Sequence, residues 1–196
     1  IIAGHETSSG TLNWAWYLIS RHPDVEAKLL AELDAELPDD DIQARDVMRL
    51  DYLHRVLLET LRLYPPVWLF TRQAKGDDQL DNYTVPAGSH IYLSPYLLHR
   101  QAGLWPEPEA FDPDRFSETL AEQRHRESYI PFSAGARRCI GEHFAFVEMQ
   151  MHLAILLREF KLTHVPDKPI TIDLAINLRT LYPIYMSLQP RITDVA

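Results

Sequence analysis

The chemistry of this sequence centres on its single cysteine, Cys139, and on the residue types around it. Cys139 ends a loop that contains Gly135, and two arginines, Arg137 and Arg138, directly precede it. A helix is predicted to begin just after the loop, so its positive N-terminal end and the two guanidinium groups favour an ionised thiol. A thiolate is a soft ligand for transition metals, and the segment therefore predicts metal ligation as one function.

Two other interpretations of Cys139 stay open on the residues alone. A lone cysteine is commonly a small buried side chain with a structural role. A cysteine nucleophile is the other alternative, and it requires a histidine base nearby. His125 and His143 flank the segment, but their spacing selects neither of them. An internal disulfide is excluded because the sequence has one cysteine.

Apolar spacing and the positions of proline and glycine predict the elements that must position this loop. The segment after Cys139 is apolar nearly all round, so we expect a deeply buried helix there. The stretch 101–136 has no regular period, and loops of this length inside a domain are usually functional. The fold class is mainly α with a small β region (α+β). The predicted helices are 1–20, 23–37, 46–64 and 141–160, and the predicted strands are 67–74, 83–85, 89–93, 170–178 and 183–189.

Length and composition bound the class of protein. The 196 residues are 46% hydrophobic and 24% charged, which is typical of a globular domain. A net charge of −9 argues against a nucleic-acid partner, since phosphate binding uses clustered Lys and Arg. No apolar run approaches the ~20 residues of a membrane span, so we expect no membrane segment in this chain. One cysteine suits a reducing compartment, and we expect a cytoplasmic location.

Four segments resemble motifs of the cytochrome P450 family, in the family's order. The pattern Phe-x-x-Gly-x-Arg-x-Cys-x-Gly at 132–141 resembles its haem-ligand loop. Residues 3–7 (Ala-Gly-His-Glu-Thr) resemble its oxygen-activation motif, and residues 59–62 (Glu-Thr-Leu-Arg) resemble its Glu-x-x-Arg motif. Residues 111–116 (Phe-Asp-Pro-Asp-Arg-Phe) resemble the segment that follows. The resemblance runs along the whole chain and corresponds to about the C-terminal half of the family's catalytic domain.

The resemblance implies that residues 1–196 are the C-terminal part of a single haem-binding monooxygenase domain whose N-terminal part is absent. The first residues, Ile-Ile-Ala-Gly, agree with this, because they read as though cut inside a helix. The implied cofactor is haem b (iron protoporphyrin IX), with Cys139 as the axial ligand of the iron. A thiolate in that position pushes electron density onto the iron and favours cleavage of the O–O bond.

Four other residues of the loop are implied to bind the cofactor. Phe132 would pack near the sulfur and limit the access of water there. Gly135 and Gly141 would let the backbone approach the macrocycle and its ligand. Arg137 would pair with a haem propionate, since a guanidinium suits a charge-assisted contact with a carboxylate.

Arg72 and His99 are two further implied propionate contacts. A plainer interpretation exists for each residue. Arg72 can be an exposed arginine of a strand, and His99 can be a surface histidine beside Arg100.

Glu59 and Arg62 lie three residues apart on a predicted helix, so they share one face. Alone they describe a surface ion pair that stabilises a helix by about 0.3 kcal/mol. The resemblance adds Arg115 as a third member and implies a buried network that fixes the loop leading to Cys139.

Gly4, Glu6 and Thr7 are the candidate catalytic residues implied by the oxygen-activation motif. Gly4 would let the helix open beside the iron, and Thr7 would donate a hydrogen bond to the bound oxygen. Glu6 would help to relay protons inward. The plain alternative for Thr7 is a hydroxyl bonded to a carbonyl one turn earlier in the helix.

An apolar segment after the Pro-Pro pair at 65–66 matches one wall of the family's substrate pocket, and the residues near 178–180 resemble another. The first wall predicts a lipophilic small-molecule substrate, although core packing explains the same side chains equally well. Its residues are Val67, Trp68, Leu69 and Phe70.

Four arginines lie close to the cysteine loop in the sequence, at 124, 126, 137 and 138. They predict a basic patch that would steer an acidic electron donor, such as a ferredoxin or a flavodoxin-like reductase domain, to this face. Exposed arginines with no partner are the alternative.

The sequence therefore predicts a haem-thiolate monooxygenase that inserts one oxygen atom from O2 into a lipophilic organic substrate, using electrons from a redox partner. A peroxide-driven hydroxylase is a variant of this function. The alternatives are a haem-binding or electron-transfer protein without oxygenase activity and an inactive truncated fragment.

Overall fold

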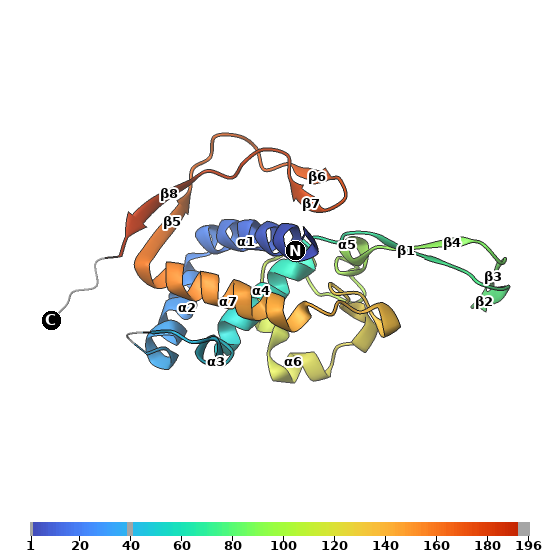
Figure 1. Cartoon of the computed structure of the whole chain (residues 1–196), viewed down its shortest axis with the longest axis horizontal. Helices are drawn as coiled ribbons and strands as arrows, with labels where there is room; N and C mark the ends of the chain where they lie inside the picture. The colour runs from blue at the N-terminus through green and yellow to red at the C-terminus, as the bar shows by residue number, and fades with distance from the viewer. Residues whose placement is uncertain (1, 39–40, 192–196) are drawn as a thin grey trace.

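The computed structural model describes residues 2–38 and 41–191, and Figure 1 shows their arrangement. The architecture is mainly α with small β hairpins, in agreement with the predicted fold class. The helices are α1 (Ile2–Arg21), α2 (Pro23–Glu36), α3 (Ala44–Val47), α4 (Asp51–Leu63), α5 (Pro95–Leu98), α6 (Glu118–Glu122) and α7 (Glu142–Glu159). Three short 3-10 helices are η1 (Pro113–Phe116), η2 (Arg126–Ser128) and η3 (Gly135–Arg137). The strands are β1 (Phe70–Gln73), β2 (Asp78–Leu80), β3 (Tyr83–Val85), β4 (His90–Leu93), β5 (Phe160–His164), β6 (Ile172–Leu174), β7 (Leu178–Thr180) and β8 (Met186–Pro190).

A helical core carries the rest of the fold. Helices α1, α2, α4 and α7 contact one another, and Figure 1 shows α1 and α7 running side by side. Each helix contributes apolar residues at helical spacing, such as Leu29 and Leu33 from α2 and Leu153 and Leu157 from α7. Leu29, Leu33 and Leu153 are fully buried, and Leu157 is nearly so. Burial of this shared face is the main stabilising contribution to the fold.

The strands form four separate antiparallel pairs, β1–β4, β2–β3, β5–β8 and β6–β7. In Figure 1, β1–β4 and β2–β3 make an arm that extends away from the helices, whereas β6–β7 is drawn above the N-terminal end of α1 in this view. The predicted strand 83–85 is confirmed, and strands 67–74 and 89–93 are confirmed with shorter limits. The predicted strand 170–178 is wrong in extent, because the chain turns at residues 175–177 and forms the hairpin β6–β7 instead.

Two helix predictions need correction. The predicted helix 46–64 is divided into α3 and α4, because Leu50 leaves the helical conformation (φ −75°, ψ 88°) and lies fully buried in the core. The predicted helix 141–160 is present as α7, but it is not buried all round. Phe144 is 71% exposed and Ile155 is 42% exposed, since one face of α7 packs on the other helices and these two side chains lie off it.

No helix in the described part of the chain is both long enough and apolar enough to cross a bilayer.

The start of α4 is capped by a side chain of α2. The carboxylate oxygens of Glu32 accept the backbone N–H groups of Tyr52 and Leu53 at 2.6 and 2.8 Å. Leu50, the N-cap residue of α4, has no side-chain oxygen to do this. Glu32 therefore satisfies two otherwise unpaired donors and places a negative charge at the positive end of the helix.

Glu32→Ala is expected to lower the free energy of unfolding by about 1 to 2 kcal/mol, because the two N–H groups lose their acceptors. Chemical denaturation checks this value. Glu36→Ala, an exposed residue at the end of the same helix, is the matched control and should change stability little. Equal effects of the two substitutions would contradict the capping role.

Candidate functional site

The loop that ends at Cys139 has a fixed backbone shape. Ser133 and Gly135 adopt positive φ values of 62° and 68°. Glycine adopts such values without a steric penalty, which explains the residue type at 135. The N–H of Cys139 donates to the carbonyl of Phe132 at 2.9 Å and closes the loop. Cys139 is exposed, so the interpretation as a buried structural cysteine is wrong. A side chain at Gly141 would meet Sγ of Cys139 at 3.9 Å, an ordinary contact, so space alone does not require glycine there.

A cavity of about 230 Å³ lies beside this loop, between it, α1 and the residues that follow α4. Thr7 and Cys139 both line it, although they lie 132 positions apart in the sequence. Most of the lining is apolar, and it includes Phe132 and Val67 from the predicted site. The full lining is Ala3, Thr7, Ser8, Thr11, Leu61, Pro66, Val67, Pro131, Phe132, Ser133, Arg137, Cys139, Ala145 and Met149.

Three residues of α1 that carry hydroxyl groups line the cavity, and Thr7 is the one predicted from the sequence. Thr7 donates to the carbonyl of Ala3 at 2.6 Å, which is the plain alternative stated for this residue. Thr11 donates in the same way to the carbonyl of Thr7 at 2.9 Å. The Ser8 hydroxyl is buried and has no hydrogen-bond partner among the described residues. The spacing of Ser8 and Thr11, three apart on one helical face, was the sequence signal that could have identified them.

Gly4 and Glu6 lie on the exposed side of α1 and do not line the cavity. Helix α1 is continuous through Gly4, so the opening that we expected beside this residue is not present. The Thr7 hydroxyl instead holds the Ala3 carbonyl within the turn.

Arg72 reaches the cysteine loop from β1. Its Nη2 donates to Oγ of Ser133 at 3.1 Å, and its guanidinium lies 4.9 Å from the ring centroid of Phe70. The interpretation as an exposed strand arginine is therefore wrong, because the side chain is partly buried and bonded to the loop. Arg137, on the loop itself, is exposed and lines the cavity.

His99 does not reach the cavity. Its side chain is fully buried, so the interpretation as a surface histidine is wrong. Nε2 accepts the N–H of Ile130 at 2.9 Å, and burial lowers the pKa of the imidazole to about 3. A neutral ring whose Nε2 already accepts a backbone hydrogen bond gives no support to the expected propionate contact.

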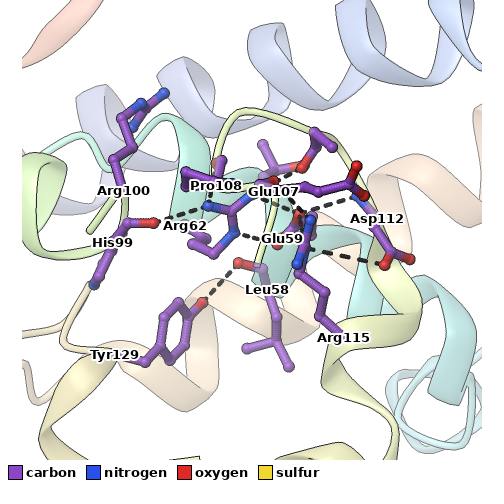
Figure 2. Close-up of polar contacts among 12 residues, drawn as sticks. Leu58, Glu59, Arg62, His99, Arg100, Glu107, Pro108, Asp112, Arg115 and Tyr129 are labelled. Atoms are coloured by element: carbon purple, nitrogen blue, oxygen red, sulfur yellow. Dashed lines mark hydrogen bonds and ion pairs between the residues drawn. The ribbon is translucent and has the colours of Figure 1, made fainter. Parts of the chain in front are cut away.

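Glu59, Arg62 and Arg115 form a buried network, which Figure 2 shows. The side chains of Glu59 and Arg62 are fully buried and make a bidentate pair, with Nε and Nη2 of Arg62 donating to Glu59 at 2.6 and 2.8 Å. Nε of Arg115 donates to the same carboxylate at 3.3 Å, and the N–H of Asp112 adds a fourth bond at 3.0 Å. Burial raises the pKa of Glu59, and the bonds and charges of Arg62 and Arg115 oppose that rise.

The two guanidinium groups also bind backbone carbonyls of the irregular stretch. Arg62 donates to the carbonyls of His99, Pro108 and Ala110 at 2.8, 2.6 and 2.9 Å. Arg115 donates to the carbonyl of Pro106, and to that of Glu107 at 2.8 Å. Residues 99–112 are thus held by side chains of α4 and η1, with little regular secondary structure of their own.

Two of the four arginines predicted to form a basic patch near the loop are engaged by neighbouring groups, whereas Arg137 is exposed. Arg124 lies over the rings of Trp105 and Phe116 and donates to the carbonyl of Arg115, and burial lowers the pKa of this guanidinium. Arg138 is paired with Glu142 through two hydrogen bonds of 2.7 Å. The side chain of Arg126 lies outside the described residues. Aromatic and acidic neighbours therefore engage arginines that the sequence alone leaves free.

The predicted substrate wall is joined to the hairpin β6–β7. Nε1 of Trp68 donates to the carbonyl of Ala175 at 3.0 Å, and the N–H of Leu178 donates to the carbonyl of Pro66 at 2.8 Å. Val67 is the member of the wall that lines the cavity beside Cys139. Leu69 and Phe70 are partly buried and do not line it.

The donor set can be compared with the needs of a metal group. The described residues contain no group of three or more His, Cys, Asp or Glu side chains that could hold a bare ion. Cys139 is nevertheless an exposed thiol beside an apolar cavity. A metal bound there would have to bring most of its own ligands, as the iron of haem does. The residues present therefore fit haem better than a free ion.

Comparisons with known proteins agree with this geometry. The Cytochrome P450 family model matches residues 1–183. Cyclooctatin synthase of Streptomyces melanosporofaciens is 40% identical over 191 residues, covering 97% of this chain and 41% of that protein. Cytochrome P450 3A12 of Canis lupus familiaris is 37% identical over 196 residues, covering 97% of this chain and 39% of that protein. A crystal structure of the cytochrome P450DA heme domain superposes with a TM-score of 0.89 at 32% identity, covering 95% of this chain and 41% of that one.

The chain thus spans about two fifths of the length of the relatives and solved structures it matches. The match extends over the helical core, the cysteine loop and most of the hairpins. Sequence, fold and family model together show that this chain belongs to the cytochrome P450 family.

Proposed function

We propose that residues 1–196 form the C-terminal part of a single haem-binding domain that acts as a haem-thiolate monooxygenase. Its reaction inserts one oxygen atom of O2 into an organic substrate, with electrons from a redox partner. The observation that carries this proposal is the shared cavity, in which the Cys139 thiol and the Thr7 hydroxyl meet an apolar lining. Membership in the family supports the same reaction class.

Cys139 is the proposed axial ligand of the haem iron. Bound in this way, the haem would supply the activation of O2. Phe132 lines the cavity beside Cys139, and in the haem-bound protein its ring would limit the access of water to the sulfur. Gly135 sets the positive-φ turn that presents the thiol, and Gly141 follows at the start of α7. We propose a b-type haem, because one cysteine cannot supply the Cys-x-x-Cys-His attachment of a c-type haem.

Arg137 and Arg72 are the proposed propionate contacts. Arg137 is exposed at the cavity, and Arg72 already bonds the loop through Ser133. Both can offer N–H donors to a carboxylate in a charge-assisted hydrogen bond. His99 is not included, since its ring is buried and engaged with Ile130.

Thr7 is the proposed hydrogen-bonding residue on the other element of the cavity. Its hydroxyl lines the cavity while donating to the Ala3 carbonyl, so its oxygen stays free to accept a hydrogen bond. Glu6 is exposed on the neighbouring position and can take protons from solvent.

The apolar lining supports a lipophilic small-molecule substrate, with the wall Val67, Trp68, Leu69 and Phe70 on one side. Membership in the family supports a protein electron donor, and we propose one of the ferredoxin or flavodoxin-like class. A composition with one cysteine supports a reducing compartment such as the cytoplasm.

Cys139→Ser in the haem-loaded protein is expected to move the Soret band of the reduced carbon monoxide complex from the long-wavelength position of thiolate ligation to a shorter wavelength. The reason is the loss of the one thiolate the sequence can supply. The difference spectrum measures this directly. A short-wavelength band in the unmodified protein that the substitution leaves unchanged would assign the ligand to another residue.

Arg62→Ala is expected to abolish haem retention, because it leaves the fully buried Glu59 carboxylate without its main partner. Breaking a buried pair in this way costs about 3 to 5 kcal/mol. The measurement is the haem content per protein after purification. Arg55→Ala on the same helix removes more exposed ion pairs with Asp51 and Asp114 and is the matched control. An Arg62→Ala protein that keeps its haem and its normal stability would contradict the proposal that this network is required for haem binding.

Thr7→Ala is expected to leave haem binding intact while more of the consumed reductant appears as hydrogen peroxide, since the cavity loses a proton-handling hydroxyl. Product and peroxide per electron are the quantities to measure. Ser9→Ala is the control, because it removes an exposed hydroxyl of the same helix that donates to the Glu6 carbonyl. It should give the same product and peroxide per electron as the unmodified protein. An unchanged product yield in Thr7→Ala would remove Thr7 from the mechanism.

A further inference from the structure

His99 contacts both the buried network and the segment that enters the cysteine loop. Its backbone carbonyl accepts Nη1 of Arg62 at 2.8 Å, which ties it to the buried network. Its ring Nε2 accepts the N–H of Ile130 at 2.9 Å, which ties it to the segment entering the cysteine loop. Figure 2 shows the bond between the His99 carbonyl and Arg62. One residue thus contacts the network with its backbone and the loop segment with its side chain.

The ring is fixed in both orientation and protonation. An Nε2 that accepts a hydrogen bond places the ring proton on Nδ1. Nδ1 has no hydrogen-bond partner among the described residues. Burial lowers the pKa of the imidazole to about 3, so the ring stays neutral and its Nε2 lone pair stays available at neutral pH.

Aromatic neighbours hold the ring in place. The ring centroid of Tyr129 lies 5.1 Å away and that of Trp105 lies 6.3 Å away. The Tyr129 hydroxyl donates to the carbonyl of Leu58 on α4 at 2.8 Å (Figure 2). Trp105 is itself flanked by the guanidinium groups of Arg62 and Arg124, at 5.2 and 4.8 Å from its ring. The imidazole is therefore packed among groups anchored to α4 and to the network.

The hydrogen bond between Ile130 and His99 lies near the bond that holds the backbone of Cys139. Phe132, two residues after Ile130, accepts the N–H of Cys139 through its carbonyl at 2.9 Å. Ile130 begins the turn at residues 131–132, since its carbonyl accepts the N–H of Ser133 at 3.1 Å, and Phe132 of this turn holds the N–H of Cys139. Two hydrogen bonds and the three residues 130–132 separate the imidazole from the candidate ligand.

We propose that His99 is a positioning residue that registers residues 130–132 against α4 and thereby fixes the backbone of Cys139. Its consequence for iron ligation rests on the proposed function. The role is distinct from a propionate contact, because it uses the ring nitrogen as an acceptor from the protein backbone.

The test compares two substitutions of similar polarity but different reach. The carbonyl of Gln extends as far as Nε2 of histidine and can accept from Ile130, whereas the carbonyl of Asn is too short. His99→Asn should accelerate amide hydrogen exchange at Ile130 and Cys139 roughly tenfold or more, measured against core amides of α4. His99→Gln should remain close to the unmodified protein.

A second readout is the share of the reduced carbon monoxide complex that keeps the long-wavelength, thiolate-type Soret band. His99→Asn should lower this share at temperatures well below unfolding, and His99→Gln should restore it. His152→Asn is the matched control, since it removes a ring that accepts Nε1 of Trp16 at 3.2 Å nearly three turns along α7. It should leave both readouts unchanged.

The proposal fails if His99→Asn matches the unmodified protein in exchange, or if His99→Gln behaves as badly as His99→Asn. An absent thiolate-type band in the unmodified protein would overturn the proposed function alone. The exchange measurement would still decide the role of His99 in that case, because it does not depend on the cofactor.

Discussion

The buried carboxylate of Glu59 is the constraint on which the site depends. A charged group without solvent is stable only when its partners are all in place, and here they are two arginines and one backbone N–H. The remaining N–H groups of those arginines donate to backbone carbonyls of residues 99–110. Five backbone carbonyls of a stretch with little regular structure are thereby given hydrogen-bond donors. Removing one member leaves several polar groups unsatisfied together, so the arrangement is cooperative.

This network organises the molecule outward from α4. Helix α4 is held at its start by Glu32 of α2 and at its centre by the apolar faces of α1 and α7. At the end of α4, Arg62 bonds the backbone of the irregular stretch at His99, and the ring of His99 in turn bonds the backbone of Ile130. The cysteine loop is the last link. The placement of one thiol thus draws on contacts distributed over most of the chain, which explains why so small a site needs so large a scaffold.

Sequence reasoning worked where a single period or motif decides the outcome. Helices α1, α2 and α7 follow from apolar spacing, and the trio Glu59, Arg62 and Arg115 follows from motif resemblance. It failed where a tertiary contact decides. The residue types at Arg49 and Leu50 do not indicate the break before α4. The break accompanies the burial of Leu50 in the core, which depends on tertiary packing. The positions of His99 and Arg124 were predicted wrongly for a related reason. The backbone N–H of Ile130 fixes the ring of His99, and the rings of Trp105 and Phe116 pack against Arg124.

The turn before the thiol contains a serine where the backbone would prefer glycine. Ser133 holds a φ of 62°, which costs a non-glycine residue about 1 kcal/mol, and its hydroxyl recovers a comparable amount by accepting Nη2 of Arg72. Glycine at 133 would relax the backbone and release the arginine, so the two effects nearly cancel. The bond between Arg72 and Ser133 therefore offsets a local cost of the backbone, although the two residues lie 61 positions apart. Loss of Arg72 alone would remove the bond and leave the cost of the positive φ at Ser133.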